Sequence, residues 1–148
     1  MEYRKIENTQ EIFSSDVLLL DEGFVSDAII QIEESAQVRY LFLPEQDGIY
    51  TRTFLLSGNC QFMGSGIFFR TNIESKMIVK VDGTGIQANL SLLALARSHT
   101  DLSISGVGQV APGSQDIHLR VDQTNILLGE AAKVRGMPIL EVATDSIE

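Results

Sequence analysis

The chain has 148 residues and a mass of 16.3 kDa, and 44% of its residues are hydrophobic, which suits one compact domain with a buried core. Its 20 acidic and 11 basic residues give a net charge of −9 and a pI near 4.6, which exclude non-specific binding to nucleic acid or anionic membranes. The single cysteine, Cys60, excludes an internal disulfide and any four-thiolate site built by one chain, and this usage points to the cytoplasm.

Most of the chain alternates apolar and polar residues, as half-buried β-strands do. The first 15 residues do not, and we expect them to form an irregular or short helical lead-in to a single domain over residues 1–148. No apolar stretch is long enough for a signal peptide or a membrane-spanning helix. The expected strands cover residues 28–32, 38–43, 51–56, 67–70, 76–81, 102–104, 117–121 and 138–142.

Residues 88–97 are ambiguous, because their leucines and alanines favour a helix while their apolar positions also alternate. We interpret them as a strand, since strand-forming segments lie on both sides. Between the strands, residues that tolerate turn conformations are grouped at 47–48, 57–59, 64–66, 82–85 and 112–114. These groups are expected to be turns.

Similar small segments recur roughly every 20 to 25 residues, at 36–41, 59–64, 85–90, 106–110 and 132–137. This interval fits one coil of a parallel β-helix, in which each coil buries its inward residues against the next. The sequence therefore predicts an all-β fold, either a β-helix solenoid or, as the alternative, a jelly-roll or β-sandwich.

Three residues qualify as candidates for chemistry. Cys60 is the candidate metal ligand or sulfur carrier, although a buried, inert cysteine is the usual case. His99 lies between Arg97 and Asp101, and on a strand these three would share a polar face. His118 is expected on an exposed polar face with Asp116 and Arg120. Two histidines without a metal-binding spacing, and no catalytic constellation, predict a protein that is not an enzyme.

The C-terminal third carries a more specific pattern. The pattern begins with Ile104, Gly106 and Val107 and continues with the pair Gln123 and Asn125. The segment Ile126-Leu127-Leu128-Gly129 comes directly after this pair. The pattern ends with Ala132 and Val134, a proline, and a final run that contains Leu140, Glu141, Val142 and Asp145. Over about 45 residues, from Ser103 to Glu148, the chain resembles the SufB/SufD family of iron–sulfur cluster assembly proteins.

The resemblance implies a right-handed parallel β-helix and a cytoplasmic, non-catalytic scaffold or accessory subunit that acts by protein pairing. SufB-type members have a cysteine where this chain has Gln123, so the likeness is to the SufD type. We expect no cofactor on this chain alone, and an iron–sulfur cluster only together with a partner. The implied partners are a SufB-like subunit and a SufC-like ATPase.

The unpaired strands of the last coil are the expected contact region for a dimer or hetero-oligomer. The predicted interface residues are Ile126, Leu127, Leu128, Pro138, Ile139, Leu140 and Val142. The alternative function, tied to the jelly-roll fold, is a module that binds a small molecule or carbohydrate. Strand direction distinguishes the two, because a jelly-roll needs antiparallel neighbours.

Overall fold

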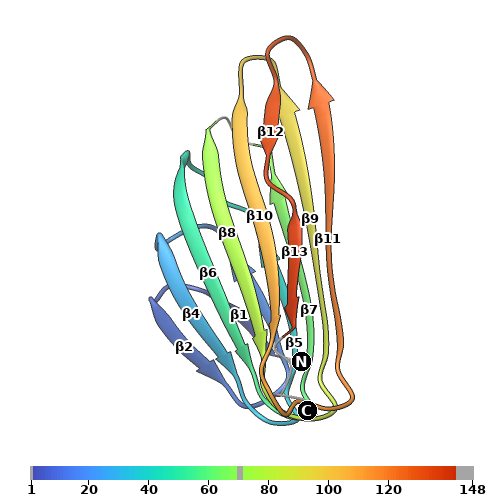
Figure 1. The fold of residues 1–148 in the computed structure, drawn as a ribbon. Helices are drawn as coiled ribbons and strands as arrows, with labels where there is room; N and C mark the ends of the chain where they lie inside the picture. The colour runs from blue at the N-terminus through green and yellow to red at the C-terminus, as the bar shows by residue number, and fades with distance from the viewer. Residues whose placement is uncertain (1, 70–71, 143–148) are drawn as a thin grey trace.

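Two parallel β-sheets run through the whole described chain (Figure 1). The structure is a computed structural model that describes residues 2–69 and 72–142. The first sheet contains the odd-numbered strands β1 (Glu2–Lys5), β3 (Val17–Asp21), β5 (Gln37–Phe42), β7 (Gln61–Phe68), β9 (Gln87–Arg97) and β11 (His118–Leu128). The second contains β2 (Gln10–Phe13), β4 (Asp27–Ile32), β6 (Gly48–Leu56), β8 (Ile73–Val81) and β10 (Asp101–Val110), with β12 (Lys133–Arg135) and β13 (Pro138–Val142) both paired to β10.

Every strand pairing between the described elements is parallel, and successive strands alternate between the two sheets. One strand from each sheet therefore makes one coil, and the coils stack as in a β-helix. This confirms the predicted parallel β-helix and shows that the jelly-roll or sandwich alternative is wrong. Among the described residues there is no helix that could cross a membrane.

The corners of the coils explain the repeat in the sequence. Gln37 pairs with Gln61 and Gln61 with Gln87, so the residues just before them, Ala36, Cys60 and Ile86, occupy equivalent buried corners. The corner turns also bond to one another, because Ser35 N donates to Gly58 O and Asn59 N donates to Thr84 O. The repeats at 36–41, 59–64 and 85–90 are thus structurally equivalent, whereas those at 106–110 and 132–137 lie in the other sheet.

The coils widen steadily along the chain. In the first sheet Val17 pairs with Val38, Val38 with Phe62, Phe62 with Ala88 and Ala88 with Leu119, so the spacing grows from 21 to 31 residues. Strand length grows with it, from four residues in β1 to eleven in β9 and β11. The molecule therefore has a narrow N-terminal end and a wide C-terminal end, as Figure 1 shows.

Two local predictions are corrected. The supposed lead-in forms the first coil, because β1 pairs with β3 and β2 pairs with β4, and Phe13 enters the core. Residues 64–66 are not a turn but lie inside β7. Gly64 points inward there, and an added Cβ would lie 2.7 Å from the ring of Phe62, so the site needs glycine for space rather than for a turn.

The remaining predicted strands coincide with strands of the structure, including the ambiguous residues 88–97 in β9, although Leu43, Phe69 and Ile117 lie just outside them. The strands β3 and β12 were not predicted. Several strands are longer than predicted, above all β10 and β11, and Arg70 at the end of one predicted strand lies outside the described residues. Inward side chains from both sheets form one continuous core. Its centre is aromatic, with Tyr40 packed edge-on against Phe54 at 4.7 Å between ring centroids and Phe42 against Phe68 at 5.8 Å.

Candidate interface at the C-terminal coil

The C-terminal coil (residues 118–142) closes the wide end of the molecule with β11, β12 and β13. Within the described residues no strand pairs with the outer edge of β11 or with the outer edges of β12 and β13. All seven predicted interface residues are exposed. The exposed fractions reach 58% at Leu127, 55% at Leu140 and 57% at Val142.

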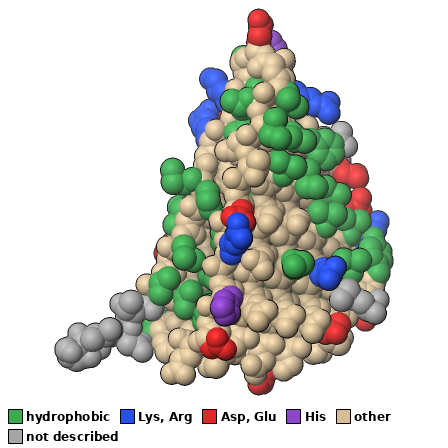
Figure 2. All heavy atoms as spheres, turned by 90° about the vertical axis from the view of Figure 1, so that its right-hand side faces the viewer, with side chains coloured by type: hydrophobic (Ala, Val, Ile, Leu, Met, Phe, Trp, Pro, Cys, Tyr) green, Lys and Arg blue, Asp and Glu red, His purple; other side chains and the backbone are tan. Residues whose placement is uncertain are grey.

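Leu127 and Leu140 are exposed because the stack of coils ends here, not because they face outward. Leu127 pairs in register with Ala96, which is fully buried, so Leu127 points into the space between the sheets. In an inner coil such a side chain is covered by the next coil. Hydrophobic side chains consequently gather on this end, which faces the viewer in Figure 2.

The narrow end is built differently. Its edge strand β1 has four residues, three of them charged, namely Glu2, Arg4 and Lys5. A short, charged edge strand is a common way to prevent pairing with another chain. The edge of β11 has eleven residues, and its second half carries Ile126, Leu127 and Leu128. The narrow end exposes Tyr3 and Ile12, but the wide end has the longer edge strand and more exposed apolar side chains.

Charge is distributed in the same unequal way. Residues 1–50 contain eleven acidic and three basic residues, whereas the C-terminal coil contains three of each. Most of the net charge of −9 is thus near the narrow end. On the wide end, Arg120 and Asp122 form an exposed ion pair at 2.8 Å, and Arg135 bonds to Asp101 at 2.5 Å. The wide end is close to neutral, which lowers the electrostatic cost of association.

An amide pair lies among the apolar residues of this coil. Gln123 Nε2 donates to Asn125 Oδ1 at 3.0 Å and lies 3.5 Å from the carbonyl oxygen of Gly136. Gln123 Oε1 is buried and accepts no hydrogen bond from the described residues. Gln123 pairs in register with Leu92, so an amide occupies an inward position that is apolar one coil earlier. Such a group is costly unless something else bonds to it.

Cys60 lies at one of the buried corners where a coil turns into the first sheet. Its side chain is fully buried, and burial raises the pKa of its thiol to about 11. The thiolate is the form that attacks sulfur or binds metal, so this thiol is inert at neutral pH. The structure gives Cys60 the role of a small hydrophobic residue, equivalent to Ala36 and Ile86.

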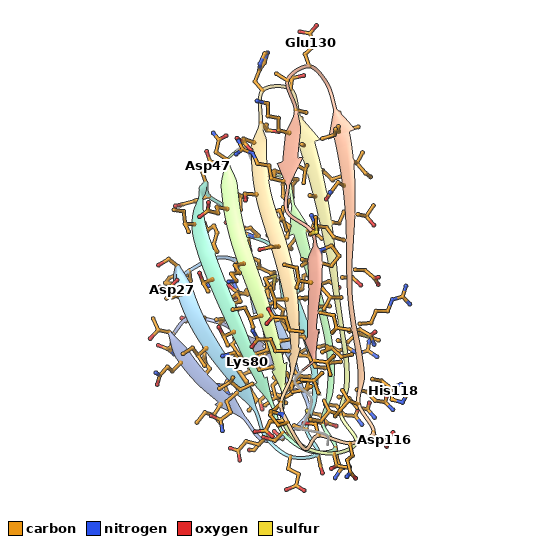
Figure 3. All side chains as sticks on the ribbon, viewed as in Figure 1. Asp27, Asp47, Lys80, Asp116, His118 and Glu130 are labelled. Carbon is orange, nitrogen blue, oxygen red and sulfur yellow. The ribbon has the colours of Figure 1, made fainter. Side chains whose placement is uncertain are left out.

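The two histidines lie at opposite ends of the strands. His118 begins β11 and points into solvent beside Asp116, with 3.9 Å between Nε2 and Oδ1 (Figure 3). The backbone of His99 bonds to that of Glu130, which is at the other end of β11. The predicted shared face of Arg97, His99 and Asp101 is wrong, because the chain turns at His99, whose φ is 59°, and passes to the other sheet.

A buried ion pair is the main feature that the sequence analysis missed. Arg52 and Asp21 are both fully buried, and the guanidinium bonds to both carboxylate oxygens, with Nε–Oδ2 at 2.5 Å and Nη2–Oδ1 at 3.1 Å. The other N–H groups of Arg52 donate to the carbonyl oxygens of Val25, Ser26 and Thr51. The alternation of inward and outward residues in β6 indicates this burial, because Arg52 occupies an inward position between Tyr50 and Phe54.

Tyr40 completes this cluster by donating its hydroxyl to Asp21 Oδ2 at 2.5 Å. Burial and the neighbouring carboxylate raise the pKa of Tyr40 well above its ordinary value. Burial opposes the charged form of Arg52, but hydrogen bonds and charge attraction from Asp21 outweigh it and leave the pKa of Arg52 raised. With its donors bonded inside the protein, the cluster holds the 22–26 loop in place and has no group left for a ligand.

A groove of about 650 Å³ lies across the outer face of the second sheet. One side chain per strand lines it in register, in the order Gln31, Leu55, Lys80, Gln109 and Glu141. Lys80 is labelled in Figure 3 near the end of β8. The lining mixes one cation, carboxylates, amides and aliphatic groups, so it does not favour one class of ligand.

No group of three or more histidine, cysteine, aspartate or glutamate side chains in residues 2–69 and 72–142 is arranged to hold a metal ion. Asp145, the last residue of the sequence pattern, lies outside the described residues. Comparisons with family models, with curated proteins and with solved structures find no match.

Proposed function

We propose that this protein is a non-catalytic scaffold subunit that works by pairing its C-terminal coil with another chain. The observation that supports this most is the contrast between the two ends. The narrow end has a short, charged edge strand, whereas the wide end has an eleven-residue edge beside exposed leucine, isoleucine and valine side chains. Unprotected edges of this kind bind other strands.

The proposed setting is iron–sulfur cluster assembly in the cytoplasm, with a SufB-like subunit and a SufC-like ATPase as partners. Its support is the resemblance of residues 103–148 to the SufB/SufD family and the single, buried thiol. Because this chain has Gln123 where SufB-type members have cysteine, cluster ligands would come from the partner.

A non-catalytic role is supported by where the reactive groups lie. The thiol of Cys60 is buried, the two histidines are at opposite ends of β11, and Arg52 has its donors bonded within the core. None of these groups is positioned to act on the same substrate atom.

The test is anaerobic co-purification with a SufB-like subunit, followed by measurement of complex mass, iron and acid-labile sulfide. We expect iron and sulfide in the complex and none on this chain alone. The double variant Leu127→Asp, Leu140→Asp should lose the complex, while Ile49→Asp, at an exposed isoleucine outside the C-terminal coil, should retain it. Stable iron on the isolated chain, or equal pairing by the double variant, would contradict the proposal.

The alternative function is binding of a small molecule or carbohydrate. It was tied to a jelly-roll fold, which this protein does not have. The groove on the second sheet is where such a ligand would bind. Saturable binding of a defined oligosaccharide that is abolished by Lys80→Ala, in a chain that does not pair, would favour that function over scaffolding.

A further inference from the structure

We propose that the 22–26 loop is a docking element, in which Phe24 anchors a basic, amphipathic segment of a partner protein. The loop joins β3 to β4 in the second coil from the narrow end (Figure 1). This surface is separate from the pairing edge of the C-terminal coil. The two proposals therefore stand or fall independently.

Phe24 is the most exposed large hydrophobic residue of the described chain, with a relative exposure of 77%. Single exposed apolar side chains are common on proteins and carry no meaning by themselves. The exposure of Phe24 differs from that of the leucines in the C-terminal coil, because the end of the stack does not cause it. Its loop connects two strands that are each paired on both sides, β3 with β1 and β5, and β4 with β2 and β6.

The buried ion pair fixes the backbone on both sides of Phe24. Arg52 Nη2 donates to the carbonyl oxygen of Val25 at 2.8 Å, and Asp21 Oδ1 accepts a hydrogen bond from the N–H of Gly23 at 3.0 Å. Replacement of a buried ion pair by apolar residues is often neutral or stabilising, so stability alone does not account for this pair. Its role here is to hold the loop that carries Phe24.

The rest of the loop also packs against the core. Gly23 has a φ of 77°, and a Cβ at this position would lie 2.8 Å from the ring of Tyr50. The carbonyl oxygen of Ser26 accepts a hydrogen bond from the N–H of Thr51 at 2.8 Å. A loop that is fixed before binding loses little conformational entropy when a partner binds. Phe24 is therefore presented by a preorganised loop.

A cleft of about 160 Å³ lies beside Phe24. The side chains that line it are half apolar and half charged: Ile6, Leu20, Phe24, Lys5, Glu7 and Glu22. Aromatic anchors beside a pocket are the usual centres of binding energy in protein interfaces. An apolar side chain of the partner can enter this cleft and pack against the ring of Phe24.

The charge around the loop selects a basic partner. Lys5, the cation at the cleft, already bonds to Glu22 at 3.1 Å. Glu7 also lines the cleft, Glu45 is adjacent because its N–H donates to the carbonyl oxygen of Glu22 at 3.3 Å, and Asp27 is exposed at the start of β4 (Figure 3). Residues 1–50 contain eleven acidic and three basic residues in all. Carboxylates around an apolar anchor favour lysine and arginine on the partner.

Binding of a defined peptide tests the anchor. The probe is a helical peptide with leucine on one face and lysine on the other, and its reference is the same peptide with serine in place of leucine. Phe24→Ala should weaken binding of the leucine–lysine peptide by about tenfold or more, because it removes the anchor and leaves every charge in place. Met63→Ala, at another exposed apolar residue, should leave the dissociation constant unchanged. Equal effects of the two substitutions, or no preference of the wild type for the leucine–lysine peptide, would overturn the inference.

A pair of charge variants tests the acidic surroundings of the loop. Glu7→Gln with Glu45→Gln should weaken binding of the same peptide and reduce its dependence on salt, because two carboxylates near Phe24 are removed. Glu33→Gln with Glu34→Gln makes the same change in the turn between β4 and β5 and should have a smaller effect. If both double variants weaken binding equally, the peptide responds only to total charge and the inference is wrong.

Photo-cross-linking tests the chemistry of the natural partner. Phe24→benzoylphenylalanine, irradiated in the native lysate, should cross-link to a protein segment in which an apolar residue lies next to lysine or arginine. Met63→benzoylphenylalanine, at the exposed control position, should not give this product. No product at position 24 above the level at position 63, or a cross-linked segment rich in acidic residues, would contradict the proposed partner.

Two cross-checks separate this inference from the proposed pairing function. Leu127→Asp with Leu140→Asp should leave binding of the leucine–lysine peptide unchanged, since these residues belong to the C-terminal coil. Phe24→Ala should leave pairing with a SufB-like subunit unchanged. If Phe24→Ala abolishes that pairing, the two surfaces are not separate and the inference is wrong as stated.

Discussion

Arg52 binds Asp21 through both oxygens of its carboxylate, although neither side chain is exposed to solvent. The pair joins β6 to the end of β3 and lies beneath the ring of Phe42, with the guanidinium carbon 4.8 Å from the ring centroid. A charged pair in this position is stable only while both partners are present.

Removal of one partner should therefore be costly. Asp21→Asn leaves the Arg52 cation buried without its counter-charge, and we expect the free energy of unfolding to fall by about 3–5 kcal/mol. Asp27→Asn, at an exposed position in β4, should change it by less than about 0.5 kcal/mol. Urea unfolding measures both. The pair is not essential to the fold if the two variants are equally stable.

The fold and the candidate interface can be predicted from the sequence only where the residues of a segment themselves carry the pattern of its structure. Alternation locates most of the inner strands but not β3, whose three consecutive leucines do not alternate with polar residues. The coil spacing suggests parallel strands, so the β-helix is predictable. The first coil is not, because its strands have four residues each and gain their stability from pairing with β3 and β4 rather than from their own pattern.

The clearest error in the predicted elements comes from interpreting glycines as turn residues. Gly64 and Gly66 have the composition of a turn, yet they are inside β7 because Phe62, Phe68 and the leucines of β9 occupy the space that their side chains would need. Packing of this kind depends on residues in the neighbouring coil, so no local pattern shows it. The exposure of the seven predicted interface residues, in contrast, was expected from the sequence, because they are apolar and belong to the last coil.

The packing at Gly64 gives a second prediction. Gly64→Ala places a Cβ 2.7 Å from the Phe62 ring and 3.2 Å from Leu90, and should destabilise the protein by about 1–3 kcal/mol. Ser65→Ala, one residue along on the outer face, is the matched control and should have little effect. Thermal unfolding of both variants tests this, and a neutral Gly64→Ala would show that the core adjusts freely.

Cys60 predicts a dependence of stability on alkaline pH. Burial raises the pKa of the thiol from its ordinary 9.0 to about 11, so the folded state favours the neutral thiol. This contribution to stability is fully present below pH 9 and is lost as the pH rises toward 11. The difference in unfolding free energy between wild type and Cys60→Ala should shrink across that interval. A constant difference would mean that the thiol is not protected in the fold.

Two buried hydroxyls should respond in opposite directions to removal. Ser75 Oγ has no hydrogen-bond partner among residues 2–69 and 72–142, so Ser75→Ala should leave stability unchanged or raise it by up to about 1 kcal/mol. Thr100 Oγ1 donates to the carbonyl oxygen of Arg97 at 2.7 Å, and Thr100→Val should cost about 1 kcal/mol. Chemical denaturation of both variants provides the comparison, and a destabilised Ser75→Ala would reveal a partner for that hydroxyl.

The most direct measurement of pairing at the wide end is amide hydrogen exchange along the two edge strands, β1 and β11, over a series of protein concentrations and with a SufB-like subunit added. We predict that the amides of β11 become protected as the chain pairs, that Leu127→Asp with Leu140→Asp removes this protection, and that β1 exchanges at the same rate throughout. Exchange of β11 that is as fast as that of β1 under every condition would contradict pairing through the C-terminal coil.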